Sequence, residues 1–158
     1  MEDIILAVDT GEKNIGLAKS DPLGLGATPL CVIPHVQREK DAAAIVEKAR
    51  EVGAVRILVG QPLNADGSAG PHARHAEKVA EAIRQVFDGE VFLWDEYGST
   101  QGTRALFREM GAGVMKSRGH LDANAAAFIL NDYLNDRAIR KEAAAFAAEK
   151  NVSEEGES

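Results

Sequence analysis

The sequence predicts a single α/β domain built on a mixed five-stranded sheet with helices on both faces. Three short apolar segments come first, and their connections are too short for the crossover that parallel neighbours require, so we expect an antiparallel meander. Two later apolar segments each follow a segment of helical periodicity, which predicts parallel strands reached by right-handed crossovers. The 158 residues, 45% of them hydrophobic and 27% charged, are enough for one sizeable core.

The antiparallel strands are expected near the start of the chain. Residues 4–8 are a continuous apolar run that ends at an Asp-Thr-Gly turn, which is typical of a buried strand. Residues 14–20 follow closely enough to form a hairpin with it, and residues 28–35 are the third strand. The third strand contains two prolines, which lack a backbone N–H, so we expect it at the sheet edge or the prolines at its ends.

The rest of the chain alternates helices and strands. Residues 38–52 place apolar side chains on one helical stripe, and Gly53 is expected to end that helix. Residues 150–158 are rich in Ser and Glu, so we expect a folded domain at residues 1–149 and a disordered acidic tail at 150–158. The later elements are expected as a strand at 55–59, a helix at 71–87, a strand at 91–94, a helix from Ser99 or Thr100 to about residue 110, and a long helix from Leu121.

The composition excludes several classes of protein. A net charge of −7 argues against a protein that holds nucleic acid by bulk positive charge alone, but it allows an active site that concentrates carboxylates. The single cysteine, Cys31, excludes an internal disulfide framework and a cysteine-based zinc site, and we expect it as a buried strand residue. We find no signal peptide, and no apolar stretch approaches the roughly 20 residues that span a bilayer. We therefore expect a cytoplasmic protein.

Three acidic residues occupy matching positions in the predicted topology. Asp9 ends the first strand, Glu96 follows the last strand, and Asp122 opens the C-terminal helix. Each has a simpler explanation alone: a turn residue for Asp9, a solvated loop carboxylate for Glu96 and a helix N-cap for Asp122. Together they predict a carboxylate cluster at one edge of the sheet, where a divalent cation would offset their mutual repulsion. Oxygen-only ligation suits Mg²⁺ or Mn²⁺, and two such ions suit a displacement at a phosphodiester.

Four sequence motifs, in the same order, carry a resemblance to a known family. They are VDTGEKNIGLA at 8–18 with SDPLG at 20–24, LVGQPLNADGS at 58–68, WDEYGST at 94–100 and LDANAA at 121–126. They resemble the YqgF/RuvX family of ribonuclease H-like proteins, described as nucleases of pre-16S ribosomal RNA and, earlier, as Holliday junction resolvases. The resemblance covers roughly residues 4–135. It implies a ribonuclease H-like fold, a metal site at Asp9, Glu96 and Asp122, and products with 5′-phosphate and 3′-hydroxyl ends.

The chain departs from the usual motifs of that family at two places. Tyr97 and Gly98 stand where the family usually has Arg and Leu, and Asn14 stands where it usually has Arg. Both departures remove positive charge beside the predicted site, where a scissile phosphate needs neutralisation. Lys13 is a candidate to supply part of that charge.

The most basic stretch follows the predicted last strand. Residues 101–119 contain four basic residues and one acid, and the glycine-rich loop at 111–119 is suited to closing over a phosphate backbone. Without neighbouring carboxylates the same stretch would be interpreted as a solvated helix face and a flexible connection. His120 is either a proton donor to the leaving oxygen or a solvated loop residue, whereas His72 and His75 are expected on an exposed helix face rather than as a metal pair. The candidate nucleic-acid-binding residues are Lys13, Arg104, Arg108, Lys116, Arg118 and His120.

Three functions are compatible with these residues. The first is a nuclease that uses two Mg²⁺ or Mn²⁺ ions on structured RNA or branched DNA, with a homodimer as a compatible assembly. The second is an RNA- or DNA-binding module that keeps the fold and loses most of the activity, because Tyr97 and Gly98 weaken the phosphate contacts. The third is an ATP-using phosphotransferase, since Asp9-Thr10-Gly11 also resembles the first phosphate loop of the actin and sugar-kinase group, but that group pairs two domains. We favour the nuclease.

Overall fold

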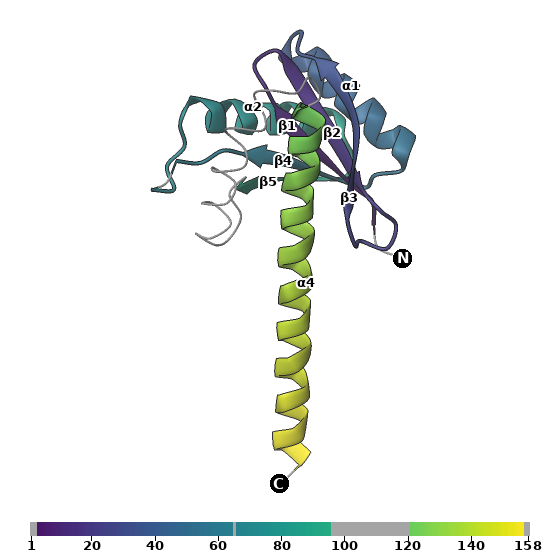
Figure 1. Ribbon diagram of the computed structural model, residues 1–158, viewed down its shortest axis with the longest axis vertical. Helices are drawn as coiled ribbons and strands as arrows, with labels where there is room; N and C mark the ends of the chain where they lie inside the picture. The colour runs from purple at the N-terminus through teal and green to yellow at the C-terminus, as the bar shows by residue number, and fades with distance from the viewer. Residues whose placement is uncertain (1–2, 65, 96–120, 157–158) are drawn as a thin grey trace.

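The computed structural model describes residues 3–64, 66–95 and 121–156, with the backbone alone for residues 121, 122 and 151–156. The elements follow the predicted order, and the helix expected near residues 99–110 lies outside the described residues (Figure 1). The strands are β1 (Ile5–Thr10), β2 (Asn14–Ser20), β3 (Ala27–Pro34), β4 (Arg56–Gln61) and β5 (Glu90–Asp95), and the helices are α1 (Arg38–Val52), α2 (Pro71–Val86) and α4 (Leu121–Gly156).

The five strands form one mixed sheet in the order β3-β2-β1-β4-β5. β1 pairs antiparallel with β2, and β2 pairs antiparallel with β3, which lies at the sheet edge as its prolines predict. β1 pairs parallel with β4, and β4 pairs parallel with β5. The predicted meander with two added parallel strands is therefore confirmed, and β1 lies at the centre of the sheet, where the connections change from antiparallel to parallel.

Helices cover both faces of the sheet, and β1 alternates between them. Leu6 and Val8 pack in one cluster with the apolar faces of α1 and α2. Ile5 and Ala7 pack in a second cluster with α4. All four side chains are fully buried, so β1 is a core strand on both faces.

One glycine and one proline set the end of α1 and the start of α2. Gly53 ends α1 with φ 74°, a left-handed conformation that glycine adopts without steric cost. Pro71 begins α2, where its missing N–H leaves no intrahelical bond unmade.

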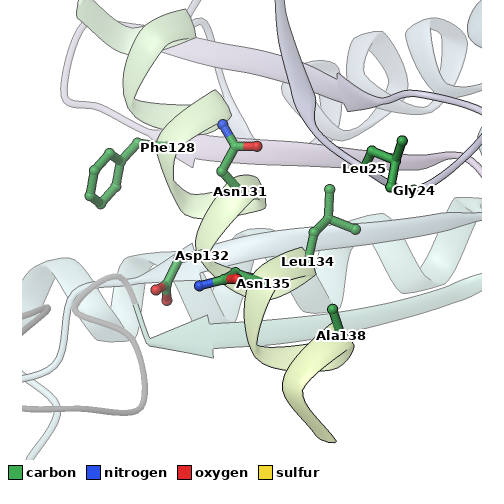
Figure 2. A pocket seen from close by; sticks show the side chains of 8 residues that line it. All are labelled: Gly24, Leu25, Phe128, Asn131, Asp132, Leu134, Asn135 and Ala138. Carbon is green, nitrogen blue, oxygen red and sulfur yellow. The ribbon is translucent and has the colours of Figure 1, made fainter. Parts of the chain in front are cut away.

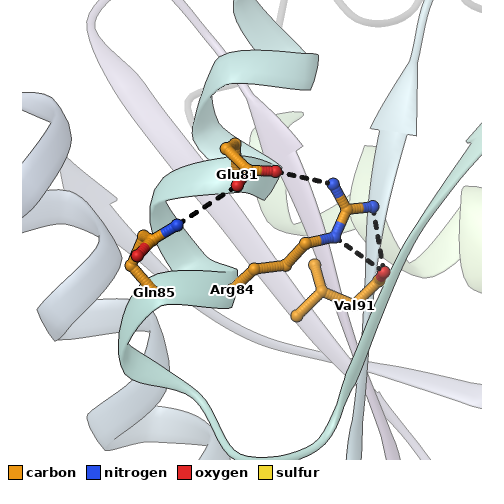
Figure 3. Close-up of polar contacts among 4 residues, drawn as sticks. All are labelled: Glu81, Arg84, Gln85 and Val91. Carbon is orange, nitrogen blue, oxygen red and sulfur yellow. Dashed lines mark hydrogen bonds and ion pairs between the residues drawn. The ribbon is translucent and has the colours of Figure 1, made fainter.

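Arg84 connects α2 to β5, because its Nε and Nη2 donate to the Val91 carbonyl at 3.3 and 3.1 Å (Figure 3). The same guanidinium contacts Glu81 at 3.2 Å, and Glu81 in turn accepts a bond from Gln85 (Figure 3).

The last helix, α4, crosses one face of the sheet and continues well beyond it as a single rod (Figure 1). Ala126, Ile129 and Leu130 are buried against the strands, whereas every residue from 138 to 150 is exposed. The helix continues to Gly156, although the sequence predicts disorder from residue 150, because the Ala-, Glu- and Lys-rich segment before that point has high helix propensity. Among the described helices, none has an apolar stretch that could span a bilayer.

Candidate active site

Strands β1, β4 and β5 all end at one edge of the sheet, at Thr10, Gln61 and Asp95. We call this the Asp9 edge, because Asp9 is the next-to-last residue of β1. Since alternate β1 side chains point to opposite faces and Ala7 packs against α4, Asp9 lies on the α4 side of the sheet. Its carboxylate is half-buried and does interact with other groups. The sequence predicts Asp9 at the end of the first strand, and β1 ends one residue later, at Thr10.

The turn after Asp9 is built around Gly11. The Gly11 N–H donates to the Asn14 carbonyl at 2.9 Å, and a Cβ at position 11 would lie 2.4 Å from that same oxygen. Only glycine therefore allows this close turn between β1 and β2. Lys13 lies exposed in the turn, and its carbonyl accepts the backbone N–H of His35 at 2.9 Å, which joins the end of β3 to the same edge.

The structure places the other predicted site residues only in part. Asp122 is the second residue of α4, so its backbone lies on the helix that covers the Asp9 side of the sheet, while its side chain is outside the described atoms. Glu96 directly follows the last residue of β5 and is outside the described residues. Strand β4 lies between β1 and β5. Also outside the described residues are Tyr97, Gly98, Arg104, Arg108, Lys116, Arg118 and His120.

A pocket of about 290 Å³ lies at the Asp9 edge, beside the start of α2. We call it the imidazole pocket, because three histidines line it together with the β1–β2 turn. The rings of His35 and His75 meet edge to face, with centroids 5.9 Å apart, and Nε2 of His72 is 3.8 Å from a Glu12 oxygen. The sequence predicts His72 and His75 on an exposed helix face, and of the two only His72 is exposed. His35 has no predicted role in the sequence. The lining residues are Gly11, Glu12, His35, Pro71, His72 and His75.

A buried carboxylate, that of Asp41, bonds to one of the histidines that line this pocket. Asp41, in the first turns of α1, is only 2% exposed. One of its oxygens accepts the Val36 backbone N–H at 2.9 Å, and the other bonds to Nδ1 of His35. A carboxylate on Nδ1 fixes the tautomer and orientation of an imidazole. Buried charges are nearly always paired, and here His35 is the partner, although the sequence alone does not distinguish Asp41 from the exposed Glu39 in the same turn.

A second pocket, of about 410 Å³, lies between α4 and the β2–β3 turn (Figure 2). Asp132 lines it and accepts a hydrogen bond from the Trp94 indole at 3.0 Å, so Trp94 is anchored to α4 as well as partly buried in the core. Burial raises the pKa of the Asp132 carboxyl, and the negative charges of Asp136 and Asp95 add to that rise, although the indole bond opposes it. Among the residues with described side chains, no three His, Cys, Asp or Glu form a group that could hold a metal ion.

Comparison with known proteins decides the family. The family described as "RuvX: Holliday junction resolvase" matches residues 3–136. The chain belongs to the RuvX family. Two curated relatives are both named "Putative pre-16S rRNA nuclease". The one from Anaeromyxobacter sp. (strain Fw109-5) is 41% identical over 132 residues, which are 84% of this chain and 96% of the relative. The one from Symbiobacterium thermophilum is 40% identical over 133 residues, which are 84% of this chain and 92% of the relative.

Solved structures agree on the fold. The RuvX chain resembles T. thermophilus RuvC in complex with a Holliday junction substrate, with a TM-score of 0.51, at 14% identity over 87% of this chain and 96% of RuvC. This likeness confirms the ribonuclease H-like architecture expected from the motifs. As a member of a family whose relatives are named as nucleases, the chain is a nuclease. The family match ends at residue 136, so the exposed part of α4 lies beyond it.

Proposed function

We propose that this RuvX protein is a metal-dependent nuclease that hydrolyses phosphodiester bonds of structured RNA, with the pre-16S ribosomal RNA precursor as the first candidate and branched DNA as the second. The observation that carries the proposal is the place of Asp9. It is a half-buried carboxylate at the end of the central strand, on the face that the start of α4 covers. The names of the relatives support RNA, and the description of the family supports junction DNA.

The residues proposed to hold the metal are Asp9, Glu96 and Asp122. The donor set fits Mg²⁺ or Mn²⁺, because all three side chains offer only carboxylate oxygens. Two such ions, when bound, would neutralise charge on the scissile phosphate and lower the pKa of a water nucleophile. The family resemblance implies products with 5′-phosphate and 3′-hydroxyl ends. The chain brings the three carboxylates from three different elements: the end of β1, the residue after β5 and the first turn of α4.

The other residues of this proposal position the nucleic acid. Lys13 is exposed in the turn that follows Asp9, where its ammonium can contact a backbone phosphate. We assign the same role to Arg104, Arg108, Lys116, Arg118 and His120 from their sequence positions. Since phosphate contacts carry no sequence information, these residues would fix the strand over the carboxylates without selecting a base.

The test is cleavage of a pre-16S RNA fragment and a four-way DNA junction in Mn²⁺, Mg²⁺ or EDTA. Asp9→Asn, Glu96→Gln and Asp122→Asn should each abolish metal-dependent cutting while binding persists. Asp88→Asn is the matched control, because Asp88 is an exposed acid in the turn before β5, at the opposite edge of the sheet. Cutting that survives EDTA or all three substitutions would refute the carboxylate site.

A second candidate, the binding module, rests on the departures at Tyr97 and Gly98. It predicts that neither substrate is cut although both are bound, and that Tyr97→Arg raises cleavage sharply by restoring a phosphate contact. An unchanged rate in that variant would count against the binding module. The preferred substrate in the same panel decides between RNA and DNA.

A further inference from the structure

The three histidines of the imidazole pocket come from two separate parts of the chain. His35 follows β3, while His72 and His75 lie in the first turns of α2. They meet because the His35 backbone is bonded to the β1–β2 turn and the His35 ring packs edge to face on His75. The three rings, together with the turn residues Gly11 and Glu12, enclose about 290 Å³, enough for a group the size of a phosphate.

The charges around this pocket favour an anion. The pKa of His75 is held below its ordinary value, first by burial and then by the positive charges of His35, Arg38 and His72. Arg38 and three imidazoles therefore lie close together here, and a bound anion would offset their mutual repulsion whenever the imidazoles are protonated. Helix α2 adds to the effect, because its N-terminus points here and its first turn contains no acidic residue.

Glu12 lines the pocket and Asp41 bonds to one of its lining residues, and neither carboxylate prevents an anion from binding. Asp41 bonds to His35 through one oxygen and accepts the Val36 N–H through the other, so both of its oxygens already have partners. Glu12 lies 3.8 Å from His72, but its side chain is 82% exposed and can therefore move into solvent. Since no three ligating side chains in the described part of the chain could hold a metal, a cation has less support than an anion.

We infer that the imidazole pocket binds a phosphate group, and that this group belongs to the backbone of the bound nucleic acid. The second half of this inference rests on the proposed function. Gly11 lines the pocket and lies two residues after Asp9, so the pocket borders the proposed site of cleavage. His72 and His75 donate to the phosphate from exposed and half-buried positions, and His35 donates through Nε2 when its ring is protonated.

The first experiment tests phosphate binding without cleavage. Inorganic phosphate is added to the full-length protein at about pH 5, more than one unit below the ordinary imidazole pKa, and the four histidine ring signals are followed by NMR at constant ionic strength. Saturable shifts of the His72 and His75 signals are expected, with a rise in the pKa of His75 as phosphate binds. Shifts that do not saturate, or that equal those caused by chloride, would overturn the inference.

The sign of one substitution separates an anion from a cation. Glu12→Gln removes a negative charge beside His72, so it should tighten phosphate binding, whereas a cation site would lose affinity. Lys78→Gln is the matched control for a charge change on α2, because Lys78 is exposed and outside the pocket lining. Weaker phosphate binding in Glu12→Gln would refute an anion site.

The second experiment asks whether the phosphate is that of a nucleic acid. In an Asp9→Asn background, the double variant His72→Gln/His75→Gln should bind the RNA and junction substrates at least about tenfold more weakly near pH 5, since tenfold is the loss expected for even one charge-assisted hydrogen bond. Above about pH 8 the same variant should bind like its parent, because the imidazoles are then neutral. An equal loss at both pH values would refute protonated imidazoles as the donors.

The outcomes of these experiments distinguish a failure of the phosphate pocket from a failure of the proposed nuclease function. Metal-dependent cleavage without saturable phosphate shifts would reject the pocket and keep the nuclease site. Saturable phosphate shifts without cleavage would reject the nuclease site and keep the pocket. Phosphate binding with unchanged nucleic-acid affinity at both pH values would assign the pocket to free phosphate and reject the backbone contact.

Discussion

Replacing Asp41 by Ala is expected to destabilise the protein by about 2–4 kcal/mol. The Asp41 carboxylate is 2% exposed and satisfies two donors, the Val36 N–H at 2.9 Å and Nδ1 of His35. The first bond caps the chain just before α1, which is worth about 1 kcal/mol. The second is a bond between an ionised group and a ring, worth about 1.5–3 kcal/mol. The two losses are not fully additive, since both atoms belong to one carboxylate.

Urea unfolding measures this loss directly. With an m-value of about 2 kcal/mol/M, the midpoint of Asp41→Ala should fall by about 1–2 M. Asp41→Asn should lose less, because its amide oxygen can still accept the Val36 N–H. Glu39→Ala is the matched control, as Glu39 is an exposed acid in the same turn of α1. If Asp41→Ala unfolded at the same urea concentration as Glu39→Ala, the assignment of Asp41 as a buried anchor would be wrong.

Three further predictions test the rest of the structure. Deleting residues 142–158 should leave the urea midpoint and cleavage rate unchanged, because the described side chains in that segment are exposed. Asp132→Asn should raise the melting temperature at pH 7 and have little effect near pH 4. The folded pKa of Asp132 lies above 3.8, so the folded state holds more protons and stability falls as pH rises through that window. The gain should stay below about 1 kcal/mol, since the carboxyl is partly exposed, and Asn keeps an acceptor for Trp94. Leu58→Ala should cost about 2–5 kcal/mol in urea unfolding, whereas Leu25→Ala, at an 80% exposed position, should cost under about 0.5 kcal/mol.

The strands and helices could be predicted because their signals are local. Apolar runs, their separations and the residues that end them are all within a few positions of one another, as with Gly53 at the end of α1 and Pro71 at the start of α2. The sense of the pairings also followed, since short connections force antiparallel pairing and helical crossovers force parallel pairing, whereas the strand order comes from the structure. The sequence does not determine how far α4 extends, because the alanines before residue 150 favour a helix while the Ser- and Glu-rich composition after it favours disorder.

The imidazole pocket could not be predicted, because its residues are distant in the sequence. His72 and His75 are recognisable as a pair on one helix, but His35 joins them only through sheet pairing and the turn after β1. Asp41 was equally hidden, since an acid in the first turns of a helix is ordinarily explained by the helix dipole. Its burial, which distinguishes it from Glu39 in the same turn, is a property of the packed structure.

The two proposed sites place a condition on the substrate. Asp9 lies on the α4 side of β1, whereas the imidazole pocket lies beside α2, which covers the other face of the sheet. A ligand that contacts both must therefore pass over the turn between β1 and β2, where Lys13 is exposed. A mononucleotide has one phosphate and can occupy only one of the sites, while a polynucleotide can place successive phosphates at both. Occupation of both sites therefore selects for a chain of nucleotides, and the exposed Lys13 lies in the turn that this chain would cross.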